Sequence, residues 1–423
     1  MNLRRKQQLT YLIADLLSSE LVWLCFLGFR WIVYDGRVAF MEDVLVPAFS
    51  FWRPLVIYPV VCVCIYYLSG YYLRPFQKPL WREFLRTFLS AAVIALLFFF
   101  IIIIDDLTES YRQYVVSLVV LFGLQFVFSY IPRLTITLLS RRRGIQRTCV
   151  VHSLDEAMNL RMGEQDEVII DLPSNFSDSQ LYSIIACLYP LACDISMVPR
   201  VYDFLTGAAR IGHIDKPSLI RITEYHMLDA ELCIKRAFDI TVSAVGLVLL
   251  SPLFLLIALQ IKLSSRGPVI YSQERIGQYG LPFRIYKFRT MIDHAEEDGV
   301  PRITLDNDPR ITKLGHWLRK FRLDELPQLW NILRGDMSVV GPRPERAFFI
   351  EQIMKEAPYY CLLYKVRPGL TSWGPIRVGY TDTMAKMIER LNCDIVYVEN
   401  MSLLLDLKIM FYTIGVVLKG KGQ

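Results

Sequence analysis

The stretch AFDITVSAVGLVLLSPLFLLIALQIKL, residues 237–263, is a long apolar segment whose conformation determines the fold of the region around it. It is long enough to cross about 30 Å of hydrocarbon at about 1.5 Å per residue, so a full crossing is one interpretation. The central pair Ser251-Pro252 argues against a straight crossing, because proline has no backbone N–H and kinks or breaks a helix. The sequence therefore predicts two helices with a break between them, and Ser251 helping to satisfy the backbone groups that Pro252 frees.

Basic residues flank both ends of this segment. Lys235 and Arg236 precede it, and Lys262 and Arg266 lie at its far end. Because basic residues concentrate on the cytoplasmic side of membranes, neither end has an extracytoplasmic pattern. A full crossing would also place the remaining polar, basic region outside, away from cytosolic nucleotides. We therefore expect the segment to enter one leaflet and return to the cytosolic side.

The first third of the chain contains four more apolar stretches. Residues 11–33, 51–73, 84–104 and 113–132 are each long enough to span a bilayer. The first stretch carries Asp15 and Glu20, and we expect neighbouring helices to shelter both carboxylates. Basic residues lie before the first stretch, between the second and third and after the fourth, so the positive-inside rule places both ends in the cytosol. The sequence therefore predicts a four-span transmembrane domain over residues 1–143.

The overall composition bounds the class of protein. Hydrophobic residues make up 53% of the 423 residues, which is high for a soluble protein. The nine cysteines form no CxxC pair, which favours buried or cytosolic thiols over zinc sites and disulfides. A net charge of +6, without a basic stripe interleaved with aromatic residues, argues against nucleic-acid binding and fits a protein beside anionic lipid or phosphorylated substrates.

Residues 144–230 have the pattern of a small α/β domain. The short runs TCVVHS, DEVIIDLPS and DISMVP alternate with helical stretches, which is typical of a parallel sheet. A nucleotide-binding Rossmann domain would carry a G-x-G-x-x-G turn after its first strand, and HSLDEA stands there instead. We therefore interpret this region as a degenerate Rossmann-like domain with a structural or dimerising role.

The region after Gly267 is dense in cationic side chains. Two strand-like runs, PVIYSQERIG and LPFRIYKFRTM, predict a hairpin, and the second run carries Lys287 and Arg289. Further cations follow at Arg319, Lys320, Arg322 and Arg343. Alternating Lys and Arg usually mark a solvated face. This many cations beside a carboxylate pair suit a polyphosphate substrate, because guanidinium groups bind phosphate oxygens in bidentate geometry.

The carboxylate pair lies in FRLDELPQLWNIL, residues 321–333. In one interpretation Asp324 is only the N-cap of a helix that has Pro327 in its first turn and ends at Gly335. In the other, the helix start also attracts phosphate, and Asp324 and Glu325 supply a nucleophile and a Mg²⁺ ligand. The dipeptide alone favours the cap.

The stretch GPRPE, residues 341–345, allows two interpretations as well. Arg343 lies between two prolines, which restrict the backbone. They either form a tight turn, with or without a cis bond, or aim the guanidinium at a fixed point.

Four stretches in fixed order resemble the bacterial sugar transferase family, the polyprenyl-phosphate phosphoglycosyl transferases of the monotopic superfamily. They are KRAFDITVSAVGLVLLSPLFLLIAL, GPVIYSQERIGQYGLPFRIYKFRTM, DPRITKLGHWLRKFRLDELPQLWNILRGDMSVVGPRPE and VRPGLTSW. The resemblance runs from Lys235 to Gln423, and the preceding architecture is similar to the long subgroup of that family. The expected fold is a four-span α-helical membrane bundle (1–143), a Rossmann-like α/β domain (144–230) and an α/β catalytic domain (231–423) with a re-entrant membrane helix at 237–263.

The resemblance implies transfer of a sugar-1-phosphate from a UDP-sugar to undecaprenyl (polyprenyl) phosphate, with release of UMP. The reaction would run by a ping-pong mechanism through a covalent aspartyl-phosphosugar, as the first membrane step of exopolysaccharide, capsule or O-antigen synthesis. The implied partners are the UDP-sugar, the lipid phosphate and membrane lipid, and the middle domain leads us to expect a homodimer. The expected location is the bacterial inner (cytoplasmic) membrane, with a multi-pass chain and the catalytic domain on the cytosolic face.

The resemblance also assigns roles to individual residues. Asp324 would be the nucleophile and Glu325 the carboxylate associated with Mg²⁺. The implied phosphate- or substrate-binding residues are Arg319, Arg343, Lys287 and Arg289, and the Ser251-Pro252 pair would make the membrane bend.

Two departures from the family pattern leave the transferred sugar open. The usual PGLTGWAQ is PGLTSWGP here, and Phe321-Arg322 stands where TS commonly precedes LDELPQ. Two alternative functions are a nucleotide-sugar hydrolase that uses the same site, and a non-catalytic membrane scaffold or regulator of polysaccharide assembly in which the dyad is only a helix cap.

Overall fold

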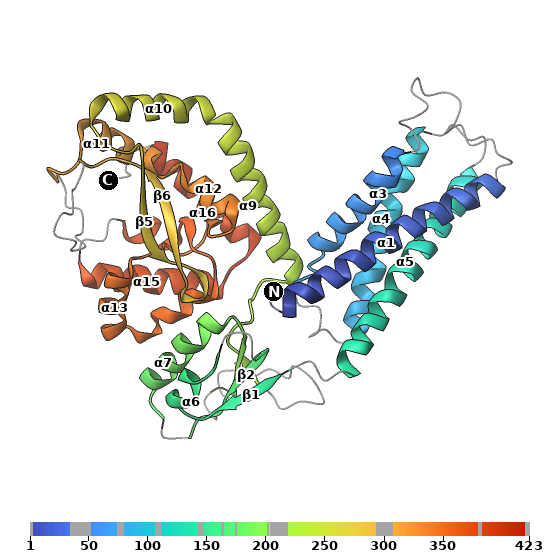
Figure 1. Cartoon of the computed structure of the whole chain (residues 1–423), viewed down its shortest axis with the longest axis horizontal. Helices are drawn as coiled ribbons and strands as arrows, with labels where there is room; N and C mark the ends of the chain where they lie inside the picture. The colour runs from blue at the N-terminus through green and yellow to red at the C-terminus, as the bar shows by residue number, and fades with distance from the viewer. Residues whose placement is uncertain are drawn as a thin grey trace. The chain divides into compact units, whose positions relative to one another are not determined.

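The structure is a computed structural model that describes most of the chain (Figure 1). The described residues are 3–33, 52–73, 80–105, 111–142, 147–161, 165–173, 176–200, 203, 219–292, 308–379 and 383–418. The chain divides into two compact units. The first is Met1–Gln146 with Leu228–Ile234, and the second is Arg147–Met227 with Lys235–Gln423.

Long apolar helices form the first unit. They are α1 (Leu3–Val33), α3 (Trp52–Leu68), α4 (Leu80–Asp105) and α5 (Tyr111–Arg142). Three of them contain apolar stretches long enough to cross a membrane, over Gln8–Arg30, Leu80–Phe100 and Tyr111–Ser140. Helix α3 ends at Leu68, before the end of the predicted span 51–73, because the chain turns at Gly70 with a φ of +75°. The described part of this unit thus has three candidate spans and one shorter apolar helix.

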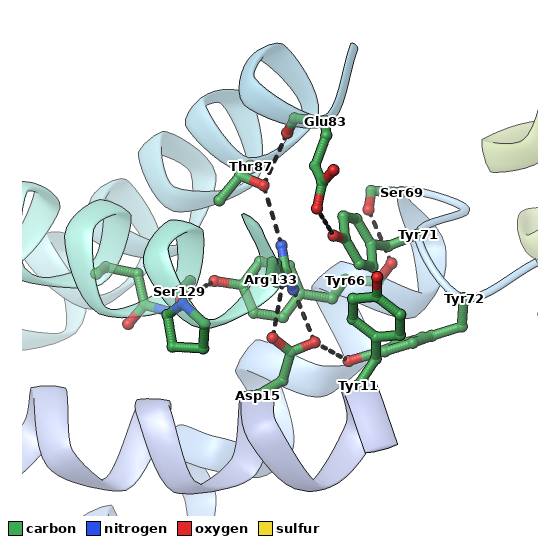
Figure 2. Close-up of polar contacts among 12 residues, drawn as sticks. Tyr11, Asp15, Tyr66, Ser69, Tyr71, Tyr72, Glu83, Thr87, Ser129 and Arg133 are labelled. Atoms are coloured by element: carbon green, nitrogen blue, oxygen red, sulfur yellow. Dashed lines mark hydrogen bonds and ion pairs between the residues drawn. The ribbon is translucent and has the colours of Figure 1, made fainter. Parts of the chain in front are cut away.

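A buried polar network joins the helices of the first unit (Figure 2). Arg133 of α5 is 0% exposed and donates from Nε and Nη2 to the two carboxylate oxygens of Asp15 on α1, both at 2.8 Å. The hydroxyl of Tyr72 donates to Asp15 at 2.6 Å. The Arg133 guanidinium carbon also lies 3.8 Å from the ring centroids of both Tyr66 and Tyr71. Pairing of this quality offsets the cost of placing charge inside an apolar bundle.

The shelter predicted for two carboxylates of α1 is found for one of them. Asp15 is 1% exposed, whereas Glu20 is exposed, so the prediction for Glu20 is wrong. Five residues on a helix turn the side chain through about 140°, away from the interior. A different carboxylate, Glu83 on α4, is buried instead and accepts hydrogen bonds from Tyr71 and Thr137 at 2.7 and 3.0 Å.

A four-stranded sheet begins the second unit. Its strands are β1 (Thr148–Val151), β2 (Glu167–Ile170), β3 (Asp194–Met197) and β4 (Ile220–Arg221), in that spatial order, accompanied by helices α6 (Leu154–Met158) and α7 (Asp178–Leu188) and the 3-10 turn η1 (Tyr189–Leu191). The three strands predicted from the sequence are present and pair in parallel. The antiparallel β4 has only two residues, too few for a recognisable pattern.

The rest of the second unit is built around two short two-stranded sheets. The antiparallel hairpin β5 (Ile270–Ile276) and β6 (Pro282–Phe288) confirms the predicted strand pair, and β7 (Ser338–Val340) pairs in parallel with β8 (Gly369–Thr371). The surrounding helices and 3-10 turns are η2 (Gln278–Gly280), α11 (Lys313–Lys320), η3 (Leu323–Glu325), α12 (Gln328–Arg334), α13 (Ala347–Glu356), η4 (Pro358–Lys365), α14 (Trp373–Val378), α15 (Met384–Glu399) and α16 (Leu403–Leu418).

The apolar segment 237–263 lies in two helices, α9 (Asp229–Leu249) and α10 (Ser251–Ser264). They meet at a bend of 61° (Figure 1). Pro252 cannot donate to the carbonyl of Val248, its normal partner four residues earlier, and the Ser251 hydroxyl donates to that oxygen instead, at 2.7 Å. The chain thus breaks its helix at the predicted pair while still satisfying the carbonyl that the proline orphans.

Both ends of the bent segment are fastened within the second unit. Near the start, Lys235 donates to the carbonyl of Val340 at 2.9 Å and pairs with Asp406 at 2.5 Å. At the far end, Arg289 donates to the backbone carbonyls of Ser265 and Arg266 at 2.9 and 2.7 Å. Two polar attachments to one folded unit hold the segment in its bent form.

Helix α10 has one packed side and one bare side. Ile257 and Ile261 are buried in a cluster with Phe288 of β6 and Leu318 of α11. On the other side, the leucine side chains are exposed, and Leu263 is 79% exposed. An exposed apolar surface of this kind marks a contact with lipid or with another protein.

We predict that the Asp15–Arg133 pair stabilises the bundle. Asp15→Asn leaves the buried guanidinium without its carboxylate partner and should cost about 3–5 kcal/mol. Thermal unfolding of the full chain in detergent measures this, and Glu20→Gln, an exposed carboxylate on the same helix, is the matched control. Equal shifts of the unfolding midpoint in both variants would show that the pair contributes nothing specific.

Candidate active site

Asp324 and Glu325 lie in the 3-10 turn η3, ahead of α12. Pro327, with φ −60° and ψ −15°, occupies the position before the first residue of α12, Gln328, and no side chain caps this helix. The prediction that Asp324 is the N-cap is therefore wrong. The proline already has helical dihedrals, and the tighter turn before it closes with a hydrogen bond from Leu326 N–H to Leu323 O at 3.3 Å.

The chain enters this turn through Arg322, whose φ of 54° and ψ of 23° are left-handed. The N–H of Arg322 donates to the carbonyl of Arg319, in the last turn of α11, at 3.0 Å. The carbonyl of Arg322 accepts from the N–H of Glu325 at 3.2 Å. A left-handed residue other than glycine costs roughly 1–2 kcal/mol. The conformation turns the backbone sharply between α11 and the dyad.

Helix α12, which follows the dyad, is fixed from two sides. Arg236 of α9 donates to two carbonyl oxygens in the last turn of α12, at 2.8 and 3.1 Å. The buried Asn331 of α12 accepts from the N–H of Tyr286 at 3.1 Å and donates to the carbonyl of Arg284 at 2.7 Å, both on β6. The bent segment and the hairpin therefore both determine where the carboxylate pair lies.

Glu325 is the ion-paired member of the dyad. Its Oε1 lies 2.8 Å from the Lys287 ammonium and 3.7 Å from Arg343, and its Oε2 lies 3.5 Å from Arg322. Burial alone would raise the pKa of Glu325, but these three cations outweigh burial and hold its pKa well below the ordinary value. Glu325 is consequently an anion throughout the neutral range.

Asp324 has the opposite character. It is 7% exposed, and among the residues that the structure describes, the ion pairs of the dyad all go to Glu325. Burial, reinforced by the charge of Glu325, raises the pKa of Asp324 to about 6, although Lys287, Arg319 and Arg322 act in the opposing direction. At neutral pH the group is an anion, the form that a nucleophile requires.

Four cationic side chains among the described residues act on the two carboxylates of the dyad. Lys287, Arg319, Arg322 and Arg343 all act electrostatically on the pair, so these four outnumber the two carboxylates by two. Arg319 is brought there by α11, whose Gly315 leaves no room for a side chain because a Cβ would lie 2.1 Å from the carbonyl of Thr290. The Arg319 Nε donates to the hydroxyl of the same threonine at 2.9 Å. An anionic ligand such as a diphosphate would find a positive environment here.

Arg289 hydrogen-bonds with residues at the end of α10. It donates from Nη1 to the carbonyl of Arg266, and from Nη2 to the carbonyl and hydroxyl of Ser265, at the end of α10. These bonds satisfy carbonyls at a helix C-terminus, where a cation is favoured. These contacts hold the end of α10, and the role predicted for Arg289 in phosphate binding stays a prediction.

Buried charged groups that the sequence reasoning missed support Arg343. Glu345, two residues on, forms ion pairs with Arg275 at 3.1 Å and with Arg390. Asp394 accepts from the Ser372 hydroxyl at 2.6 Å and from the Gly374 N–H at 2.9 Å. Its carboxylate also interacts with the backbone N–H of Arg343. The signal that could have revealed them is helical spacing, because Arg390 and Asp394 share the buried stripe of α15 with Met387, Leu391, Tyr397 and Val398.

The arrangement fits Mg²⁺ only in part. Among the described residues no group of three His, Cys, Asp or Glu side chains could hold a metal ion. Asp324 and Glu325 provide two adjacent carboxylates, and Mg²⁺ commonly takes one or two carboxylates together with waters and substrate phosphates. Two adjacent carboxylates therefore suit an ion that binds together with a phosphorylated substrate, and the role of Glu325 as a Mg²⁺ ligand stays a prediction.

Comparison with known proteins identifies the family pattern. A model of the bacterial sugar transferase family matches residues 230–420. An exopolysaccharide production protein, PSS, of Rhizobium leguminosarum bv. phaseoli is 42% identical over 202 residues, which are 45% of this chain and 99% of that protein.

Two longer relatives carry enzyme names. The UDP-N-acetylgalactosamine-undecaprenyl-phosphate N-acetylgalactosaminephosphotransferase of Aeromonas hydrophila is 35% identical over 278 residues, 66% of this chain and 65% of that protein. The UDP-glucose:undecaprenyl-phosphate glucose-1-phosphate transferase of Escherichia coli (strain K12) is 39% identical over 224 residues, 52% of this chain and 48% of that protein. The chain thus matches between about half and two thirds of the length of these two relatives.

The electrostatics of the dyad predict opposite stability effects for its two members. A raised carboxyl pKa means that the folded state favours the protonated form, so the contribution of Asp324 to stability is lost as pH rises through about 6. Asp324→Asn should therefore not destabilise the protein at pH 8, and should stabilise it by on the order of 1–3 kcal/mol.

Glu325→Gln is the matched comparison. The lowered pKa of Glu325 means that its ionised form stabilises the fold above pH 5, so this variant should lower the unfolding midpoint at pH 8. Thermal unfolding of both variants in detergent, at pH 5 and pH 8, measures the pair. Destabilisation of Asp324→Asn as large as that of Glu325→Gln would contradict this electrostatic assignment.

Proposed function

The chain belongs to the bacterial sugar transferase family, and we propose that it transfers a sugar-1-phosphate from a UDP-sugar to a polyprenyl phosphate. The observation that carries this proposal is the contrast within the dyad, where the ion pairs of the described residues hold Glu325 and none of them holds Asp324. The names of the relatives supply the substrate classes, undecaprenyl phosphate and a UDP-linked sugar. The proposed product is a polyprenyl-diphosphate-sugar, as the first membrane step of polysaccharide assembly.

In the first half-reaction, a carboxylate oxygen of Asp324 attacks the phosphorus that bears the sugar. The bond from this phosphorus to the oxygen bridging it to the uridine-bearing phosphate breaks, and UMP leaves with the bonding electrons. Lys287, Arg319 and Arg343 bind the phosphate oxygens and stabilise the charge that develops on them. The result is a phosphosugar bonded to Asp324.

In the second half-reaction, an oxygen of the lipid phosphate attacks the phosphorus of the aspartyl-phosphosugar. The bond from this phosphorus to Asp324 breaks, which restores the carboxylate and gives the lipid-linked diphosphate sugar. Dividing the transfer into two displacements lets one set of cations stabilise both. Mg²⁺, held by Glu325 and the substrate phosphates, would neutralise part of the phosphate charge.

The bent helix pair suits delivery of a lipid substrate. A straight crossing of 27 residues, residues 237–263, would place its ends about 40 Å apart. Its observed ends are instead both fastened within the second unit, by Lys235 and by Arg289. We infer that α9 and α10 enter one leaflet from the cytosolic face, with the exposed leucines of α10 in lipid, and that the helices of the first unit form a four-span anchor.

Activity with purified components tests the proposal. The full chain in detergent or nanodiscs, given Mg²⁺, a panel of UDP-sugars and undecaprenyl phosphate, should release UMP over many turnovers only when the lipid is present. Release of UMP without lipid would favour the nucleotide-sugar hydrolase. Absence of UMP release with every UDP-sugar would favour the non-catalytic scaffold. Asp324→Asn should lower turnover by at least about 10³-fold.

The first half-reaction should also depend on pH. Because the pKa of Asp324 is about 6, the rate of UMP release should be constant above pH 7 and fall about tenfold per unit well below pH 6. A rate that is unchanged down to pH 4.5 would contradict the assignment of Asp324 as the ionised nucleophile.

Cysteine labelling tests the re-entrant topology. Single cysteines at Leu228 and Pro268, which are exposed residues on either side of the bent pair, should both react only after the cytosolic face becomes accessible. Arg37→Cys, in a loop that the charge pattern places outside, is the control that should react from outside. Outside labelling at Pro268 would show that the segment crosses the membrane.

A further inference from the structure

Arg322 combines an unusual backbone with an unusual place. Among the described residues, only Ala192, Tyr279 and Arg322 have a positive φ without being glycine. Left-handed conformations of this kind are uncommon outside glycine and tend to cluster at functional sites. Arg322 is the one of these three that adjoins the dyad, two residues before Asp324.

The side chain of Arg322 approaches the dyad on a different oxygen from the other cations. Its Nη1 lies 3.5 Å from Glu325 Oε2, whereas Lys287 and Arg343 approach Oε1. The Lys287 contact is 2.8 Å, the length of a strong ionic hydrogen bond. A separation of 3.5 Å is at the outer limit for a hydrogen bond, so the Arg322 guanidinium is weakly held by Glu325.

Arg322 is also able to reach a ligand. Its side chain is 29% exposed, and its charge acts on both Asp324 and Glu325. A guanidinium has five N–H donors in a planar fork that matches two phosphate oxygens. A weakly held, partly exposed fork beside a nucleophile is suited to exchanging its carboxylate contact for a phosphate.

We propose that Arg322 is a phosphate-binding residue that contacts the diphosphate of the nucleotide-sugar donor, and that its left-handed backbone places the guanidinium over the dyad. This inference rests on the proposed function and adds a residue to the donor site. It also separates two properties of one position, because the backbone conformation suits glycine and the charge requires a basic side chain.

Three substitutions separate these properties. Arg322→Gly keeps the left-handed backbone and removes the charge, Arg322→Lys keeps the charge without the fork, and Arg322→Ala removes the charge and leaves the strain. Arg334→Ala is the matched control, because it removes one arginine from the exposed end of α12, where its Nε lies 3.7 Å from Asp336. Binding of a UDP-sugar is measured by calorimetry in full-length protein that carries Asp324→Asn, so that no turnover occurs.

We expect Arg322→Gly to weaken UDP-sugar binding at least tenfold without lowering the unfolding midpoint. Arg322→Lys should recover part of the affinity. Arg322→Ala should lose affinity and also unfold at a lower temperature. Arg334→Ala should bind the UDP-sugar as tightly as the Asp324→Asn parent does. Binding by Arg322→Gly within twofold of its parent would overturn the inference and leave the proposed function intact. Absence of UDP-sugar binding in the parent protein and in the wild type would instead contradict the proposed function.

Steady-state kinetics distinguish the donor phosphate from the lipid phosphate. In the otherwise wild-type chain, Arg322→Gly should raise the KM for the UDP-sugar at least tenfold and change the KM for undecaprenyl phosphate by less than threefold. A rise confined to the KM for the lipid would overturn the donor assignment.

Discussion

The hydrogen bond from the Ser251 hydroxyl to the Val248 carbonyl is the contact that makes the break between α9 and α10 compatible with an apolar environment. Pro252 orphans that carbonyl, and an unpaired carbonyl is costly in an apolar setting. With the serine in place the helix can break and bend by 61°, so that both of its ends fasten within one folded unit. The same helix reaches the site, because Arg236 near its start holds the last turn of α12.

The proposed chemistry rests on an asymmetry between two adjacent carboxylates. Cations on both oxygens keep Glu325 ionised, whereas burial raises the pKa of its neighbour Asp324 to about 6. Environments that separate the pKa values of paired groups commonly assign them different roles. Among the described residues, the geometry separates an anion held by three cations from one that has no ion pair, and the proposed function uses the second for attack on phosphorus.

Local patterns in the sequence were sufficient for much of the fold. The proline break, the β5–β6 hairpin and three parallel strands each depend on residues close together in the chain. Contacts between residues far apart in the chain could not be predicted from such local patterns. Arg289 resembles the other cations in sequence, but in the fold it binds the end of α10 instead of the dyad, and Glu20 faces outward while Glu83 takes the buried place. The left-handed turn at Arg322 contains no glycine, so the sequence does not predict it.

Formation of a covalent phosphosugar on Asp324 is the central claim, and mass spectrometry of the protein tests it most directly. The full chain is incubated with a UDP-sugar and Mg²⁺ without lipid acceptor, quenched and digested. The account predicts that the peptide containing Asp324 gains the mass of one sugar phosphate, and that added undecaprenyl phosphate removes this mass. UMP release and lipid product without any adduct on that peptide, under conditions that preserve acyl phosphates, would contradict it.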